Sequence, residues 1–269
     1  MIAFANQKGG VGKTTSSVNT AVSLAQRGFH VLLIDGDPQG NATSSFGIDK
    51  AGVRYSTYDV LVDEVPVAQA IAVTDRSGLD LLPSTPVLAG AEIELVEVPD
   101  RERRLSRALA GTLGRYDAVL IDCPPSLGLL TINALTAARS IVVPIQCEFL
   151  ALEGLGQLIT TIDLVKRRLN PALDIVGVLM TMFDGRTRLS AHVVDEVRRY
   201  FPHRIFATIV PRSIRLAEAP SYGQAILEYD PSSRGAIAYE AFTTELVERL
   251  ALTRRGTVQR AEEETRQAP

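Results

Sequence analysis

A short run near the amino terminus, Lys8-Gly9-Gly10-Val11-Gly12-Lys13-Thr14-Thr15, has the residue types and spacing of a phosphate-binding loop. Its glycines let backbone N–H groups turn toward an anion without a clash from a β-carbon. Lys13 can reach the β- and γ-phosphates of a nucleotide, and the Thr14 hydroxyl can bind Mg²⁺. The alternative is a flexible glycine turn, which explains neither the lysine nor the threonine.

The segments on either side of this loop are those that a phosphate-binding loop requires. Residues 2–5 are apolar and predict a strand, and the run that follows the loop predicts a helix whose positive amino-terminal dipole would face the anion. The usual pattern places glycine at position 7, where this chain has Gln7, and a second lysine, Lys8, lies inside the loop. One triphosphate in a monomer does not need two lysines, so we expect Lys8 to reach a nucleotide held by another subunit.

Two further segments end in carboxylates that suit a metal–phosphate site. Residues 35–41 read Asp-Gly-Asp-Pro-Gln-Gly-Asn, and of Asp35 and Asp37 one could contact Mg²⁺ through water while the other positions the attacking water. The alternative is a solvated turn, because these residue types all form turns. An apolar strand ending at Asp122 has the Walker B arrangement, which delivers a carboxylate to the metal. The next loop, residues 123–128, is predicted to sense the nucleotide.

The elements that must position these residues alternate along the chain. Strands are predicted at residues 2–5, 30–34, 79–82, 118–121, 140–144, 175–182 and 205–209. Helices are predicted at residues 15–27, 92–113, 129–138, 152–169, 190–200 and 236–252. Several strands are apolar at consecutive positions, as expected when both sheet faces are covered. We therefore predict an α/β P-loop fold, with a doubly wound, mostly parallel sheet flanked by helices and ligands at the carboxyl ends of its strands.

Length and composition narrow the class of protein. The chain has 269 residues and is 46% hydrophobic, and we expect residues 1–252 to form a single P-loop ATPase domain and residues 253–269 a polar, disordered tail. No apolar run approaches the roughly 20 residues of a membrane helix, and the amino terminus lacks a signal segment. We expect Cys123 and Cys147 to be buried thiols of a cytoplasmic protein that does not bind membranes, with a cluster shared across a dimer as the alternative.

The charge balance bears on nucleic-acid binding. The net charge is −3 and the isoelectric point is near 5.7, whereas a dedicated nucleic-acid-binding domain is usually strongly basic. Any contact with DNA would therefore need a local basic patch. The three histidines are scattered and show no metal-ligand spacing.

Together these motifs resemble those of the ParA/Soj chromosome-partitioning ATPases, which carry a deviant Walker A motif. The resemblance rests on residues 7–15, 35–41 and 122–126, and on later matches at residues 148–154 (EFLALEG) and 211–221 (PRSIRLAEAPS). It covers about residues 1–250. It implies an ATPase that binds ATP or ADP with Mg²⁺ and forms an ATP-sandwich homodimer.

The resemblance also implies roles for individual residues. Lys8 would be the deviant lysine that reaches the partner's phosphates, and with Lys13 and Asp37 it would form the catalytic set, Asp37 orienting the hydrolytic water. Mg²⁺ would lie among Thr14, Asp37 and Asp122, the last acting through water. The nucleotide would contact Lys8, Gly9, Gly10, Val11, Gly12, Lys13, Thr14, Thr15, Asp122, Pro211 and Ser213.

The expected contacts to the base include one departure from the family. The family often has Asn where this chain has Ser213, so at this position the sequence departs from the pattern on which the base contact rests. Residues 181–184 (Thr-Met-Phe-Asp) are also predicted to border the base.

DNA is the second ligand that the resemblance implies. ATP-bound dimers of this family bind DNA without sequence preference through arginines on one face, and the matching positions are Arg186 and Arg215. Arg188, Arg212 and residues 166–168 (Lys-Arg-Arg) are further candidates, and the alternative for all of them is a solvated surface. Dimerisation would double a weak patch of cations and so link ATP binding to DNA binding.

The resulting hypothesis is a nucleoid-associated ATPase that segregates chromosome origins. A partner resembling the centromere-binding ParB/Spo0J proteins would stimulate slow hydrolysis, since no arginine finger is recognisable. One alternative is a MinD-like membrane-associated ATPase, although residues 254–269 have no apolar face. The others are a metabolic ATPase on the same scaffold, such as a cluster-bearing reductase or a small-molecule ligase, and a DNA scaffold that never hydrolyses ATP.

Overall fold

A computed structural model of the protein describes residues 1–148 and 155–254. Its strands form one sheet in the order β3-β4-β2-β5-β1-β6-β7-β8. The strands are β1 (Ile2–Phe4), β2 (Val31–Asp35), β3 (Ala72–Val73), β4 (Leu79–Leu82), β5 (Ala118–Asp122), β6 (Ser140–Gln146), β7 (Asp174–Phe183) and β8 (Ile205–Pro211). Every neighbouring pair is parallel except β3–β4. The predicted doubly wound, mostly parallel sheet is therefore confirmed.

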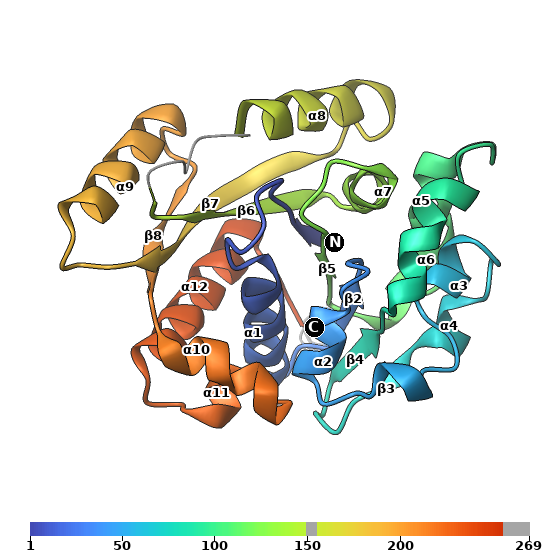
Figure 1. Ribbon diagram of the computed structural model, residues 1–269, viewed down its shortest axis with the longest axis horizontal. Coiled ribbons are helices and arrows are strands. Elements are labelled where there is room, and N and C mark those ends of the chain that lie inside the picture. The colour runs from blue at the N-terminus through green and yellow to red at the C-terminus, as the bar shows by residue number, and fades with distance from the viewer. Residues whose placement is uncertain (149–154, 255–269) are drawn as a thin grey trace, which may run out of the picture.

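Helices cover both faces of the sheet (Figure 1). One face carries α1 (Lys13–Gln26), α2 (Asn41–Ser45), α10 (Ile214–Glu218), α11 (Ile226–Tyr229) and α12 (Arg234–Leu250). The other carries α3 (Thr57–Leu61), α4 (Val67–Ala70), α5 (Ala91–Glu94), α6 (Arg104–Leu109), α7 (Leu129–Ala137), α8 (Leu155–Arg168) and α9 (Arg188–Tyr200). Short 3₁₀ turns lie at η1 (Lys50–Gly52), η2 (Pro86–Gly90), η3 (Arg101–Arg103), η4 (Leu113–Arg115) and η5 (Ala219–Tyr222).

The alternation of side chains along each strand divides the core in two. In β1, Ile2 and Phe4 pack with α1 and α12, whereas Ala3 packs on the opposite face. Because apolar residues are needed on both faces, the central strands carry the consecutive apolar residues seen in the sequence. Among the described residues, no helix is long and apolar enough to cross a membrane.

One prediction about the elements is wrong, and several short elements were not predicted. The helix predicted over residues 92–113 is wrong, because α5 ends at Glu94 and the chain resumes a regular helix only at Arg104. Pro99 lies between them and disfavours a helical residue before it, and Asp100 adopts a left-handed conformation with φ of 54°. The edge strand β3 was not predicted, since it has two residues. The start of the helix predicted from residue 152, and the tail beyond residue 254, lie outside the described residues.

Candidate nucleotide site and neighbouring basic surface

The order of the strands brings three sequence motifs to one place. The central strand β1 leads into the glycine-rich loop, and it pairs with β5 so that Phe4 is opposite Asp122. Strand β2 pairs with β5 on its other side, with Asp35 opposite Asp122. The carboxyl ends of parallel strands are where α/β sheets bind ligands, so the loop and both acidic segments meet at one ligand-binding edge.

The glycine-rich loop is held open by its backbone conformation. Gly10 and Gly12 have φ of 73° and 88°, values that favour glycine, and Gly12 caps the start of α1. The Lys13 side chain is buried, and its Nζ donates a hydrogen bond to the carbonyl of Lys8 at 3.1 Å. Burial lowers the pKa of Lys13, and the negative charge of Asp122 opposes this shift. This lysine is therefore fixed inside the loop, where an anion would be its natural partner.

Lys8 has a different environment from Lys13. Its backbone N–H donates to Asn6 Oδ1 at 3.0 Å, which shapes the start of the loop. Its side chain is half-buried and makes no ion pair within residues 1–148 and 155–254. The two lysines thus differ: Lys13 bonds within its own loop, whereas Lys8 has no ion pair in the described part of its own chain.

The surroundings of the Asp122 carboxylate bear on metal binding. The residue is fully buried, and neither of its carboxylate oxygens has a hydrogen-bond partner. Burial, followed by repulsion from Asp35, raises the pKa of Asp122 well above its usual range. The Thr14 hydroxyl and the Lys13 ammonium are near enough to oppose this shift, and because buried polar atoms are nearly always paired, these oxygens have room for a further donor or a cation.

A hydrated Mg²⁺ ion fits this requirement. Magnesium in nucleotide sites keeps several waters and takes one or two carboxylates together with phosphate oxygens. The described residues contain no group of three or more His, Cys, Asp or Glu side chains that could hold a metal alone. The sparse oxygen donors here, Asp122 with the nearby Thr14 hydroxyl, suit magnesium held mainly by a nucleotide.

The two carboxylates of the second motif have separate surroundings. Asp35 Oδ2 accepts hydrogen bonds from the Thr43 N–H at 2.8 Å and from the Thr43 hydroxyl at 2.7 Å, and its Oδ1 accepts one from the Asp37 N–H at 3.2 Å. Burial raises the pKa of Asp35 to about 6. Asp35 therefore tethers the start of α2 to the strand. Asp37 is also buried, and its Oδ1 accepts a bond from the Gln39 N–H at 2.9 Å.

A pocket of about 210 Å³ opens beside the glycine-rich loop at the ends of β7 and β8. It is lined by Gly12, Thr15, Thr181, Met182, Val210, Pro211, Arg212, Ser213, Leu216, Ala217 and Tyr239. The Thr181 hydroxyl donates to the carbonyl of Val11 at 2.8 Å, which joins the pocket to the loop. Its place next to the loop and its mostly apolar wall suit a nucleotide base.

Several residues that were predicted to lie near the base do line this pocket. Pro211, Ser213, Thr181 and Met182 all line it, whereas Phe183 and Asp184 do not. Sequence reasoning missed Tyr239, which lines the pocket from α12, far along the chain. The hydroxyl of Tyr239 lies 3.1 Å from the hydroxyl of Ser16 in α1. No local motif marks such a long-range contact.

The two arginines predicted to bind DNA lie after the last two strands. Arg186 follows β7, is 87% exposed, and pairs with Asp184 at 2.7 Å. Arg215, in α10 after β8, is 56% exposed and pairs with Glu218 at 3.2 Å and Asp230 at 3.7 Å. Both cations are therefore accessible, and each already has a carboxylate partner in its own chain.

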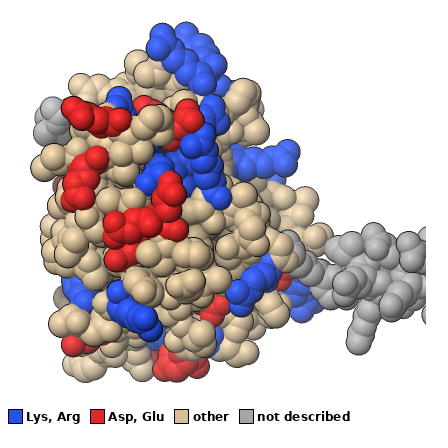
Figure 2. Space-filling view, turned by 90° about the vertical axis from the view of Figure 1, so that its right-hand side faces the viewer, with Lys and Arg blue, Asp and Glu red and all other residues tan. Residues whose placement is uncertain are grey.

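The other basic candidates divide between two edges of the sheet. Arg212 and Arg188 lie on the same side as Arg186, and Arg212 pairs with Glu148 at 2.7 Å. Lys166, in the last turn of α8, pairs instead with Asp174 at the start of β7, so residues 166–168 lie at the opposite end of that strand from Arg186. Figure 2 shows the side formed by α3 to α6, where both signs of charge are interspersed.

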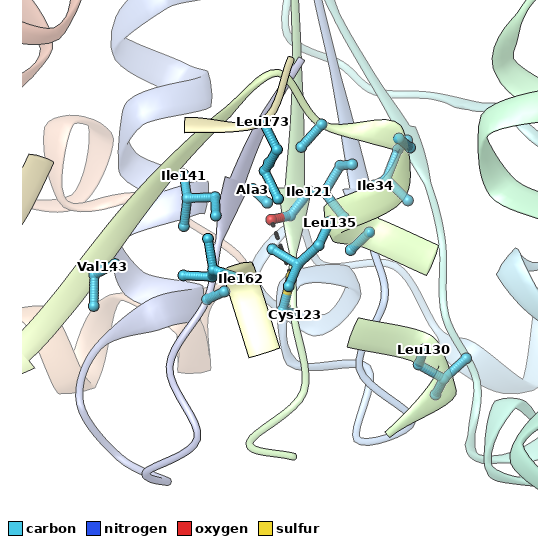
Figure 3. Packing of buried hydrophobic residues seen from close by; sticks show 14 of the residues in the cluster. Ala3, Ile34, Ile121, Cys123, Leu130, Leu135, Ile141, Val143, Ile162 and Leu173 are labelled. Atoms are coloured by element: carbon cyan, nitrogen blue, oxygen red, sulfur yellow. Dashed lines mark hydrogen bonds between the residues drawn. The ribbon is translucent and has the colours of Figure 1, made fainter. Parts of the chain in front are cut away.

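Both cysteines are buried, as predicted. Cys123 lies among Ile121, Leu135 and Ile162 in the core (Figure 3). Burial raises the pKa of the Cys123 thiol, and it raises that of Cys147 to about 12. Protonated thiols in an apolar core are poor metal ligands and nucleophiles, so neither cysteine suits a cluster-bearing reductase.

Known proteins share this sequence and this fold. The family model described as "AAA domain" matches residues 1–175. The sporulation initiation inhibitor protein Soj of Bacillus subtilis is 56% identical over 239 residues, which cover 89% of this chain and 94% of that protein. The chromosome partitioning protein ParA of Myxococcus xanthus is 50% identical, covering 93% of this chain and 88% of that protein.

A solved structure from Mycobacterium smegmatis superposes closely. It is named cobyrinic acid a,c-diamide synthase and contains ADP and magnesium. It is 41% identical to this chain with a TM-score of 0.83, and the match covers 93% of this chain and 94% of that one. The likeness extends over the whole sheet and not only the glycine-rich loop.

Proposed function

Because the chain belongs to the ParA/Soj family of chromosome-partitioning ATPases, we propose that it couples ATP hydrolysis to the binding and release of DNA in chromosome-origin segregation. The observation that carries the ATPase chemistry is the buried, unpartnered carboxylate of Asp122 at the edge that also holds Lys13. Such a pair, behind a glycine-rich loop, suits a magnesium–nucleotide complex.

Each residue of the site has a role in this proposal. The loop residues Gly9–Thr15 donate backbone N–H groups to the phosphates, and Lys13 adds a positive charge that its buried position keeps in place. Thr14 and Asp122 would hold Mg²⁺, Asp122 through water. A magnesium ion held there would supply positive charge that offsets the charge of the phosphates.

Hydrolysis needs a positioned water. Asp37 orients this water, and its buried backbone supports the task, because its carbonyl accepts a hydrogen bond from the Ser84 hydroxyl at 2.7 Å. With one carboxylate and no recognisable arginine finger, turnover by the protein alone is slow. A ParB/Spo0J-like partner accelerates it.

Dimerisation links the nucleotide to DNA. In the ATP-bound homodimer, Lys8 of each subunit reaches the phosphates held by the other. Two copies of the surface with Arg186 and Arg215 then act on one duplex, and the second binds at a high effective concentration. The contacts are to backbone phosphates, so binding is independent of sequence and places the protein on the nucleoid in the cytoplasm.

A gel-shift experiment tests this function. DNA is incubated with the protein and ATP, ADP or no nucleotide, at two salt concentrations, together with an Arg215→Glu variant. We expect retardation only with ATP, weaker at high salt and lost in the variant. A lack of retardation in all nucleotide states would exclude the DNA-binding part of the proposal while leaving the ATPase part intact.

The name of the M. smegmatis structure makes a ligase that forms amides the second candidate. The 56% and 50% identical partitioning relatives favour the first. The two are separated by asking which addition stimulates ATP hydrolysis. Stimulation by a small carboxylic acid with an amine donor, and none by DNA, would favour the ligase.

A further inference from the structure

An open hollow of about 720 Å³ lies at the ends of β7 and β8. Its wall includes three arginines, Arg186, Arg212 and Arg234, and one carboxylate, Asp184. Only Arg186 among them belongs to the predicted DNA-binding pair. The hollow therefore extends the basic surface toward α12, a helix to which the sequence assigns no contact with DNA.

The three arginines are not equivalent in charge. Arg186 is paired with Asp184 at 2.7 Å, and Arg212 is paired with Glu148 at 2.7 Å. Arg234 is exposed and has neither an ion pair nor a side-chain hydrogen bond with any described residue. An incoming anion would meet two arginines that already have a counter-charge and one that has none. Arg234 is thus the least neutralised cation of the hollow.

The positive charge of Arg234 does not stabilise α12, the helix that this residue begins. It is the first residue of α12, and the side chain of Ser233 caps that end by accepting a hydrogen bond from the Ala236 N–H at 3.2 Å. A cation at the amino end of a helix is opposed by the positive end of the helix dipole. With no partner in the described chain and an unfavourable place on its helix, Arg234 is better explained by an external anion.

The surroundings favour an extended polyanion over a small ligand. The hollow is open, and Ile214 beside it is 77% exposed, so a bulky ligand can approach. Ile214 begins α10, and the next residue of that helix is Arg215, the second predicted DNA contact. Phosphate contacts require only a cation that can reach the backbone.

We propose that Arg234 contacts a backbone phosphate of the same duplex as Arg186 and Arg215, which adds one phosphate per subunit to the DNA site. This inference rests on the proposed DNA-binding function. It assigns to DNA binding a residue that neither the motif analysis nor the family resemblance singles out.

The salt dependence of DNA binding tests this assignment. Binding of the ATP-loaded protein to a fluorescent duplex of arbitrary sequence is measured at several NaCl concentrations. Each neutralised phosphate contributes about −0.9 to the slope of log affinity against log salt, so Arg234→Ala should make the slope of a dimer less steep by about 1.8. The affinity should fall by roughly tenfold or more near 0.1 M salt, and Arg234→Lys should retain the wild-type slope.

Arg199→Ala is the matched control, because Arg199 is an exposed arginine in the last turn of α9 at the other end of that helix from the hollow. Equal changes in both alanine variants, or an unchanged slope in Arg234→Ala, would overturn the assignment of Arg234 alone. A loss of ATP binding in Arg234→Ala would also overturn it, by making the effect indirect. If the wild-type protein with ATP binds no DNA, the proposed function itself fails, and this outcome is visible before any variant is tested.

Discussion

Asp35 and Asp122 are opposite each other on neighbouring strands β2 and β5, and both carboxyl groups are buried. Burial raises the pKa of each, that of Asp35 to about 6; repulsion from Asp35 adds to the shift of Asp122, and repulsion from Asp37 adds to that of Asp35. A carboxyl group with a raised folded-state pKa binds its proton more tightly in the folded protein. Its contribution to stability is therefore complete below pH 4 and is lost as the pH rises through the folded-state pKa.

We accordingly predict that the nucleotide-free protein becomes less stable between pH 4 and pH 7. The free energy of unfolding should fall by roughly 1–3 kcal/mol across this range, given about 1.4 kcal/mol for each unit of pKa shift. Urea denaturation at closely spaced pH values measures it. Asp122→Asn should flatten the profile and raise the stability at pH 7 while abolishing ATP hydrolysis. A wild-type stability that rises steadily through this range would contradict the prediction.

The two loop lysines should separate nucleotide binding from dimerisation. Lys13→Ala removes the buried ammonium, and a hydrogen bond to a charged group contributes about 1.5–3 kcal/mol, so we expect ATP affinity to fall at least tenfold. Lys8→Ala should leave ATP binding by the monomer nearly unchanged but abolish ATP-dependent dimers and hydrolysis. Calorimetry, sedimentation and phosphate release measure the three properties. A Lys8→Ala protein that dimerises normally with ATP would refute the role proposed for Lys8.

The sequence allowed the sheet and the phosphate loop to be predicted because both depend on local patterns. The strands β1, β2 and β5 are apolar and end at the glycine-rich loop, Asp35 and Asp122. The same pattern could not tell which of Asp35 and Asp37 is held by the protein's own hydrogen bonds. That distinction depends on Thr43 in α2, whose N–H and hydroxyl both donate to Asp35.

Tertiary contacts set the remaining limits of prediction. Tyr239 reaches the base pocket from more than 200 residues away in the chain, and Arg234 enters the basic hollow from the same helix. Neither belongs to a motif. The helix predicted across Pro99 failed for a local reason, because a proline disfavours the helical conformation of the residue before it.

Gly36 should be required for the close approach between the backbone that follows β2 and the end of β5. Its N–H donates to the carbonyl of Asp122 at 2.9 Å, and a β-carbon at Gly36 would lie 2.8 Å from that same oxygen. Gly36→Ala must therefore move the backbone that holds Asp37 and Asp122, at an expected cost of about 1–3 kcal/mol. Thermal unfolding and ATP hydrolysis measure the effect. Gly114→Ala is the control, because a β-carbon there meets no atom within 4 Å. Equal losses in both variants would argue against a special role for Gly36.

The buried thiols should be unreactive in the native protein. Burial raises the pKa of Cys147 to about 12 and that of Cys123 further, so almost no thiolate exists at pH 8. We expect iodoacetamide to label neither cysteine until denaturant is added, with mass spectrometry as the readout. We also expect no visible absorbance from a cluster in purified protein. Rapid native labelling of Cys123 would show that it leaves the core of Figure 3 and would reopen the cluster-bearing alternative.

The carboxylates that pair with Arg186 and Arg215 should lower the affinity of the protein for DNA. Asp184 pairs with Arg186, and Glu218 pairs with Arg215, so both cations are partly neutralised before DNA arrives. Exposed ion pairs are weak, typically 0–1 kcal/mol, and we expect Asp184→Asn or Glu218→Gln each to raise DNA affinity about two- to fivefold. Because salt screens surface charges, the gain should shrink as ionic strength increases.

The control for this prediction is a variant that removes one carboxylate from another part of the protein. Glu196→Gln removes one carboxylate from α9, where the side chain lies 3.8 Å from His192 instead of beside an arginine of the basic surface. If the gain comes from releasing Arg186 and Arg215, the two surface variants should exceed Glu196→Gln in ATP-dependent DNA affinity at low salt, and binding without ATP should also become detectable. An equal gain from Glu196→Gln would mean that net charge alone sets the affinity, since the local ion pairs would then have no separate effect.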